Sequence, residues 1–126
     1  MPNAPFRSIA SAGQTVSPDA VRELVGRACP AADYHGQRVC LIIPDGTRTA
    51  PVGLMFKTLF AQLAGSVKKF DVMIALGTHP AMPDDAINAR VEITAAERST
   101  TYRDVEFINH EWDNPAALRD LGAIPA

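Results

Sequence analysis

The sequence predicts an α/β protein, a three-layer sandwich of helices around a small, mainly parallel sheet. Short apolar runs at 38–43, 70–76 and 105–109 have the length and composition of strands. The first two lack polar alternation, as strands buried on both faces do. A segment with helical spacing lies between them, and strand, helix and strand in this order form a right-handed unit with parallel strands.

Composition supports one globular domain and excludes several classes of function. The chain has 126 residues, a net charge of −2 and 47% hydrophobic residues, which argues against a nucleic-acid surface. It contains neither a membrane-spanning apolar stretch nor a secretory signal. Cys29 and Cys40 show no disulfide or metal-binding pattern, and both are expected to be small core residues. We therefore expect a cytoplasmic protein without membrane or nucleic-acid partners.

The first half of the chain predicts an arm followed by a βαβ unit. Residues 1–16 have no strong period and are expected to form an extended arm or an edge strand. Ser17 is a candidate helix N-cap because Pro18 suits the first helical position. The helix between the first two strands is expected to start from a cap at Thr49 and to end near Gly65. Its core-facing stripe comprises Val52, Met55, Phe56, Leu59, Phe60 and Leu63.

The second half predicts shorter elements. A short helix is expected over 84–90, residues 94–101 are ambiguous, and a second short helix is expected near 115–121. The final residues, 123–126, do not resemble a closing element.

Two polar loops follow the first two predicted strands. Residues 44–48 read Pro-Asp-Gly-Thr-Arg, and residues 77–79 read Gly-Thr-His. Because ligands of open α/β sheets bind at the carboxyl ends of the strands, we expect both loops to face one pocket.

The loop residues suggest an anion site with a proton-transfer group. Arg48 can hold a carboxylate or phosphate in bidentate geometry, supported by the start of the following helix, or it can pair with Asp45 on the surface. His79 can move a proton near neutral pH. Asp45 can orient His79, bind a ligand hydroxyl, or cap its own loop.

Other candidates are weaker. His110 follows the third predicted strand, and its structural role is favoured over a functional one. Trp112 is expected to pack against the final helix, and His35 to be solvated. Glycine-rich phosphate loops and nucleophile signatures are missing.

Three segments resemble the nickel-pincer lactate racemase family. The stretch 44–48 resembles its D-x-T-R-P motif, the stretch 75–82 (ALGTHPAM) resembles its A-[LT]-G-[TF]-H-R-P-M motif, and 108–111 (INHE) resembles its N-H-D segment. The three occur in family order. The resemblance covers roughly residues 35–122.

This resemblance implies a nickel-pincer pyridine mononucleotide as cofactor and a 2-hydroxy acid or related carboxylate as substrate. Cofactor contacts carry over to Asp45, Gly46, Thr47 and Arg48. Arg48 would also hold the substrate carboxylate, and His79 would be a catalytic proton acceptor and donor. No metal ligand carries over. The pincer-linked lysine, the metal-ligand histidine and the second catalytic histidine of the family lie beyond the last residue here.

The sequence also departs from the family motifs. Pro80 stands where the racemases usually have arginine, and Thr49 where they often have proline. These changes leave the substrate open.

Two functions from different classes follow. In the first, the chain forms part of a 2-hydroxy-acid racemase or epimerase, which is an isomerase. The isolated chain is not expected to complete that reaction. The alternative is a non-catalytic binding or self-assembly module with the family fold, forming a homo-oligomer through exposed sheet surfaces. A phosphate-ligand hydrolase using His79 is disfavoured because no nucleophile or metal cluster accompanies it.

Overall fold

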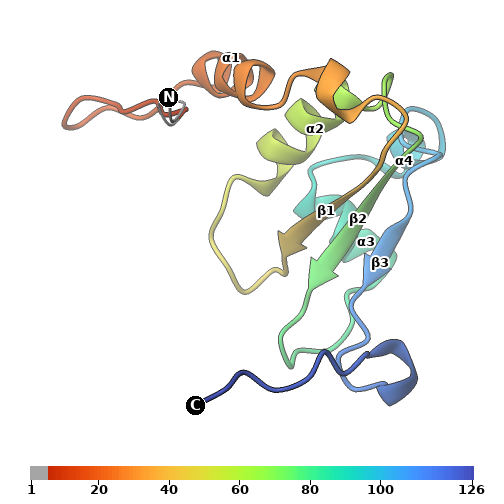
Figure 1. Ribbon diagram of the computed structural model, residues 1–126. Helices are drawn as coiled ribbons and strands as arrows, with labels where there is room; N and C mark the ends of the chain where they lie inside the picture. Colours follow the sequence, from red (N-terminus) through yellow and green to blue (C-terminus); the bar gives the residue numbers. More distant parts are fainter. Residues whose placement is uncertain (1–5) are drawn as a thin grey trace.

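The computed structural model describes residues 6–126, so the first five residues of the predicted arm lie outside the described part (Figure 1). The elements in chain order are α1 (Pro18–Ala28), the 3₁₀ helix η1 (Ala31–Tyr34), β1 (Arg38–Pro44), α2 (Val52–Leu63), β2 (Lys69–Ala75), α3 (Asp84–Arg90), α4 (Ala95–Ser99), β3 (Phe107–Asn109) and the 3₁₀ helix η2 (Pro115–Ala117).

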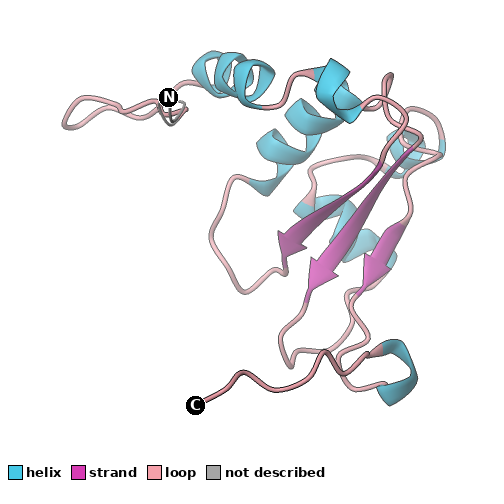
Figure 2. Ribbon diagram, viewed as in Figure 1, coloured by secondary structure: helices cyan, strands magenta, loops and turns pink. Residues whose placement is uncertain are grey.

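The three strands form one parallel sheet in the order β1-β2-β3 (Figure 2). Ile42 of β1 is in register with Met73 of β2, which is in register with Ile108 of β3. The α/β class and the parallel sheet are therefore confirmed. Because the strands run in the same direction, the loops that follow them leave from one edge, the carboxyl edge.

The helices cover one face of the sheet. Phe70, Val72 and Ile74 of β2 are buried in the core, whereas the alternate residues Asp71 and Met73 are only half-buried. Right-handed crossovers between strands in sequential order place every crossover helix on the same side. Residues 6–126 thus form two layers at the sheet, and the third layer of the predicted sandwich is not formed by them.

The uncovered face corrects the expectation that β1 is buried on both sides. Ile42 is 65% exposed. Cys40, which was expected in the core, is exposed on the same face. An apolar run alone does not show whether a second layer covers it. We call Cys40, Ile42, Met73 and Ile108 the open face.

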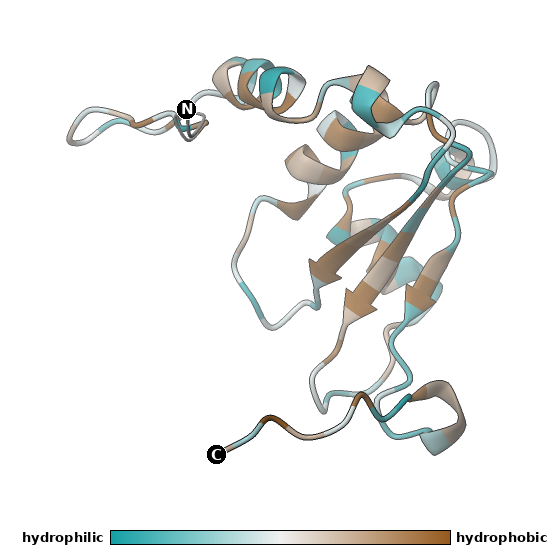
Figure 3. Ribbon diagram, viewed as in Figure 1, coloured by the Kyte–Doolittle hydropathy of each residue, from teal (hydrophilic) through white to brown (hydrophobic). Residues whose placement is uncertain are grey.

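Phe56 of α2 lies at the centre of the core and is fully buried. Its ring centroid lies 5.1–6.4 Å from those of Tyr102, Phe107 and Phe70. In Figure 3 the most hydrophobic segments lie along the strands, with further apolar positions on α2. Burying such aromatic side chains is a main source of stability in a small domain.

Side chains cap the starts of two α-helices, α1 and α4. The Ser17 hydroxyl accepts a hydrogen bond from the amide of Ala20 at 3.1 Å, which confirms the predicted cap. Thr94 and Glu97 form a capping box, which explains why the ambiguous segment contains α4.

Two predicted boundaries are wrong. Helix α2 begins at Val52 with Pro51 as N-cap, so Thr49 belongs to the preceding loop. The helix expected near 115–121 is only the 3₁₀ turn η2, because Leu118 and Leu121 find no core to pack against and are 49% and 93% exposed.

Residues 6–16 form no helix or strand, and in Figure 1 this arm loops out beyond the start of α1 and returns toward it. The ring centroid of Phe6 lies 5.7 Å from Cζ of Arg27 in α1. The end of the chain after η2 is likewise irregular and exposed. In the described part, no helix has the length and apolar character needed to cross a membrane.

Candidate functional site

The loop between β1 and α2 is organised by the carboxylate of Asp45. This residue is only 5% exposed, although it lies directly after a strand at the sheet edge. Its Oδ1 accepts hydrogen bonds from the backbone amide of Thr47 at 3.1 Å and from the Thr47 hydroxyl at 2.5 Å. The loop therefore turns around its own aspartate, as Asx turns do.

The second loop meets the first at this carboxylate. His79, four residues beyond the end of β2 at Ala75, places its Nδ1 2.6 Å from Asp45 Oδ2. The His79 side chain is 47% exposed, whereas that of Asp45 is 7% exposed. Asp45 thus joins the two loops and caps its own loop at the same time, combining two of the alternatives considered from the sequence.

The charge state of Asp45 follows from these contacts. The hydrogen bond from the Thr47 hydroxyl is the largest of the contacts that lower the pKa of Asp45, and His79 and the Thr47 amide add to it. Together they outweigh the raising effect of burial and bring the pKa to about 2. The carboxylate is therefore ionised at neutral pH and can only accept hydrogen bonds. In neutral His79 the proton accordingly lies on Nδ1, which leaves Nε2 as a free acceptor.

A cleft of about 280 Å³ lies between the loops. It is lined by Ile42, Ile43, Pro44, Asp45, Thr47, Arg48, Ala75, Leu76, Gly77 and His79. Asp45, Arg48 and His79 therefore line one cleft.

Arg48 is exposed and forms no ion pair with the residues that the structure describes. It is not paired with Asp45, because the two carboxylate oxygens of Asp45 bond Thr47 and His79. An unpaired guanidinium beside a cleft can receive an anion.

The start of α2 is less available to a ligand than the sequence suggests. The Glu92 side chain occupies the space where a Cβ at position 53 would lie, so a larger residue there would require Glu92 to move. A carboxylate at the first turn of a helix already offsets the positive end of the helix dipole. Among the groups at this cleft, Arg48 is therefore better placed than the start of α2 to receive an anion.

Residues at and just after the end of β3 hold the second loop in place. The Asn109 side chain accepts from the Met82 amide and donates to the Met82 carbonyl, both at 2.9 Å. Trp112 Nε1 donates to the His79 carbonyl at 3.1 Å. Trp112 packs against the main core rather than against a final helix.

This supporting role was not among the sequence predictions. Asn109 could have been found, because it is the last residue of the third strand, at the same edge as the two loops. The side chain of His110 forms no hydrogen bond within the described residues, so no function is assigned to it.

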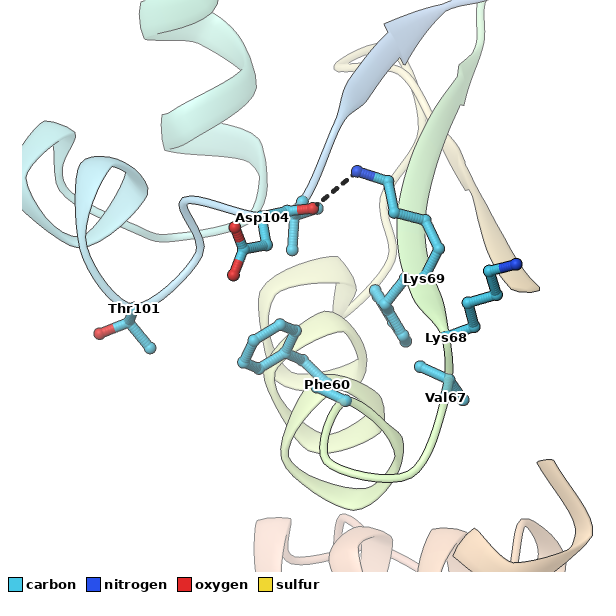
Figure 4. Close-up of a pocket in the computed structure, with 9 residues that line it drawn as sticks. Phe60, Val67, Lys68, Lys69, Thr101 and Asp104 are labelled. Atoms are coloured by element: carbon cyan, nitrogen blue, oxygen red, sulfur yellow. Dashed lines mark hydrogen bonds between the residues drawn. The ribbon is translucent and has the colours of Figure 1, made fainter. Parts of the chain in front are cut away.

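A larger cavity of about 450 Å³ lies at the opposite, amino edge of the sheet (Figure 4). Lys69 extends its Nζ to the Asp104 carbonyl at 2.9 Å and lies 3.3 Å from Asp71. Phe60 forms an apolar wall, and Lys68 points away from it in Figure 4. This cavity lacks the convergence of acid, base and cation seen at the carboxyl edge.

Within residues 6–126, no group of three or more His, Cys, Asp or Glu side chains is placed to hold a metal ion. Cys29 is half-buried just after the end of α1 and packs against the core, whereas Cys40 is exposed on the open face.

Comparisons with known proteins place this geometry in context. A family model described as the lactate racemase N-terminal domain matches residues 14–126. Among solved structures, the chain is similar to a crystal structure of a protein from Thermotoga maritima, with 28% identity and a TM-score of 0.73 over 88% of this chain. The chain spans only 25% of that protein. A search of curated proteins gave no match.

Proposed function

The chain belongs to the lactate racemase N-terminal domain family, and from this premise we propose that it supplies the carboxylate-binding and proton-transfer part of a nickel-pincer-dependent 2-hydroxy-acid racemase or epimerase. The observation that carries the proposal is the single cleft lined by Arg48, Asp45 and His79. These residues match the family motifs found in the sequence.

The side chains in the cleft suit a 2-hydroxy acid. The Arg48 guanidinium can bind the substrate carboxylate through two parallel hydrogen bonds. The 2-hydroxyl group lies one carbon from the carboxylate, so a substrate held by Arg48 presents it within the same cleft as His79. Holding base and substrate together in this way lowers the entropic part of the barrier.

His79 would act as the base for the hydroxyl proton. Its Nε2 accepts the proton, and the resulting imidazolium donates its Nδ1–H to ionised Asp45, 2.6 Å away. Asp45 thus orients the ring and stabilises the charge that develops on it. Donation of the proton back from Nε2 completes the cycle in the reverse direction.

Part of the implied cofactor suits the residues present. Gly46, Thr47 and Arg48 lie at the exposed tip of the first loop, where the Gly46 amide and the Arg48 guanidinium can donate to the phosphate of a mononucleotide. The amide and hydroxyl of Thr47 donate to Asp45 instead and so shape the loop that would contact the cofactor. Among the described residues, no group of three or more His, Cys, Asp or Glu side chains is placed to hold the metal ion of that cofactor. When bound, the cofactor would supply the acceptor for the α-hydride.

Calorimetry with lactate tests the proposal. The 126-residue chain is expected to bind lactate weakly without turnover, and Arg48→Ala should lower the affinity about tenfold because one bidentate charged contact is lost. Lys68→Ala removes one exposed cation at the opposite edge and serves as the matched control. Equal affinities for wild type and Arg48→Ala would contradict the proposal.

The open face favours a second candidate function, a self-assembly module. Cys40 and Ile42 are exposed, Met73 is half-buried, and one edge of β1 pairs with no other strand of the described chain, residues 6–126. Exposed apolar faces and strand edges favour association with another chain.

Sizing and metal analysis of the purified chain separate the two candidates. A stable metal-free dimer that Ile42→Lys converts to a monomer would support the module. A monomer that binds lactate through Arg48 would support the enzymatic role.

A further inference from the structure

Arg90 contacts both ends of the first loop from outside it. It lies in the last turn of α3 and is half-buried. Its Nε donates to the Pro44 carbonyl at 3.1 Å, and its Nη2 donates to the Arg48 carbonyl at 2.8 Å. One guanidinium therefore bridges the residue that precedes Asp45 and the residue that carries the free cation of the cleft.

The loop has few other backbone restraints. Between β1 and α2, the amide of Arg48 bonds the Asp45 carbonyl at 3.4 Å, and the amide of Val52 bonds the Ala50 carbonyl at 2.8 Å. The remaining contacts of the loop described above run through the Asp45 carboxylate. Without Arg90, the backbone at Arg48 would be held mainly by one long hydrogen bond.

The shape of the guanidinium matters for this bridge. Its N–H donors are fixed in one plane, so two carbonyls bound to it are held at a set separation. A lysine ammonium carries the same charge but is a single point on a flexible stem. Arg90 also makes no ion pair with the residues that the structure describes, so its donors are directed to these two carbonyls.

We propose that Arg90 is a positioning residue of the candidate site, which fixes the 44–48 loop so that Asp45 and Arg48 face the second loop. The use of the restrained loop in catalysis rests on the proposed function, but the restraint of the loop by Arg90 can be tested separately. Arg90 acts through the backbone of the loop and is not itself placed in contact with substrate.

The test compares Arg90→Lys with Arg98→Lys. Arg98 of α4 is also half-buried and bonds Asn88 at 3.0 Å and Asp84 at 3.1 Å, but it touches neither loop. Both variants keep the charge and remove one guanidinium. The first readout is hydrogen exchange of the Thr47 amide, which reports on loop closure around Asp45 without any ligand.

We expect Arg90→Lys to speed exchange at Thr47 about tenfold, the effect of losing one hydrogen-bonded restraint, while Arg98→Lys leaves it unchanged. Lactate affinity should fall several-fold in Arg90→Lys alone. Unchanged exchange at Thr47, or equal acceleration in both variants, would overturn the proposal. If wild type does not bind lactate, the proposed function fails while the exchange result still decides the role of Arg90.

A measurement on the wild type covers the case in which Arg90→Lys does not fold. The Nε–H resonance of Arg90 should be observable and protected from exchange at pH 7, with or without lactate, because it is bonded to the Pro44 carbonyl. A rapidly exchanging Nε–H would contradict the bridge.

Discussion

The two edges of the sheet carry cavities of different size and different chemistry. The amino-edge cavity is the larger, about 450 Å³ against about 280 Å³ at the carboxyl edge. At the amino edge Lys69 is already engaged with Asp104 and Asp71. At the carboxyl edge the guanidinium of Arg48 and Nε2 of His79 have no hydrogen-bond or ion-pair partner among residues 6–126. The difference shows that unsatisfied polar groups held in fixed positions, rather than volume, distinguish a candidate site.

Strand direction explains where these groups collect. In parallel sheets, the loops that follow the strands meet at the carboxyl edge, so residues distant in sequence converge there. Asp45 and His79 are an example. At the amino edge, the Phe60 ring lies 5.7 Å from that of Phe70 and 4.8 Å from that of Tyr102, so the wall of the cavity extends the core.

The largest expected effect is on stability at the amino edge. Phe60→Ala should lower the free energy of unfolding by about 2 kcal/mol, less than for a fully buried phenylalanine because Phe60 is half-buried. Chemical denaturation measures this loss, and Phe60→Leu should recover most of it. Lactate affinity should not change in folded Phe60→Ala. A loss of lactate affinity together with stability would contradict the separate roles of the two edges.

Asn109→Ala at the carboxyl edge should have a smaller effect on stability and a clear effect on the second loop. Losing the two hydrogen bonds to Met82 should cost about 1 kcal/mol and increase motion around His79. NMR relaxation of residues 77–82 measures the motion. Asn114→Ala, which removes the cap of η2, is the control, and the same loop response in both variants would contradict the role of Asn109.

Asp45 predicts an acid-dependent difference. Its pKa is lowered to about 2 in the folded protein, so ionised Asp45 stabilises the fold above its unfolded pKa, near 4. This contribution is lost as pH falls from about 4 to about 2. Asp45→Asn should therefore lose less stability than wild type over that interval, as measured by denaturation at each pH. Parallel curves for the two proteins would show that these contacts do not stabilise the carboxylate.

The smallest effect is expected for Lys69→Met. Its interaction with Asp71 lies near the surface, so the free energy of unfolding should change by about 0.5 kcal/mol or less. Lactate binding should be unchanged. A loss of lactate affinity would place the anion site at the amino edge instead.

The sequence predicted elements whose determinants are local. The helix over 84–90 agrees with α3, and the predicted strands agree with β1 and β2 to within a residue at each end, because composition and spacing carry these signals. The pairing of the two polar loops followed from strand direction. The bridge from Arg90 to Pro44 spans 46 positions and has no local signature. The open face was also beyond prediction, because the apolar residues of β1 do not show whether a second layer covers them.

The central claim is that Arg48 and His79 act on one ligand in one cleft, and an NMR titration with lactate tests it most directly. We predict that the side-chain resonances of Arg48 and His79 shift together with a single dissociation constant, while those of Lys68 and Lys69 remain unchanged. Shifts at Arg48 without any response at His79, or a response centred on the two lysines, would contradict the account.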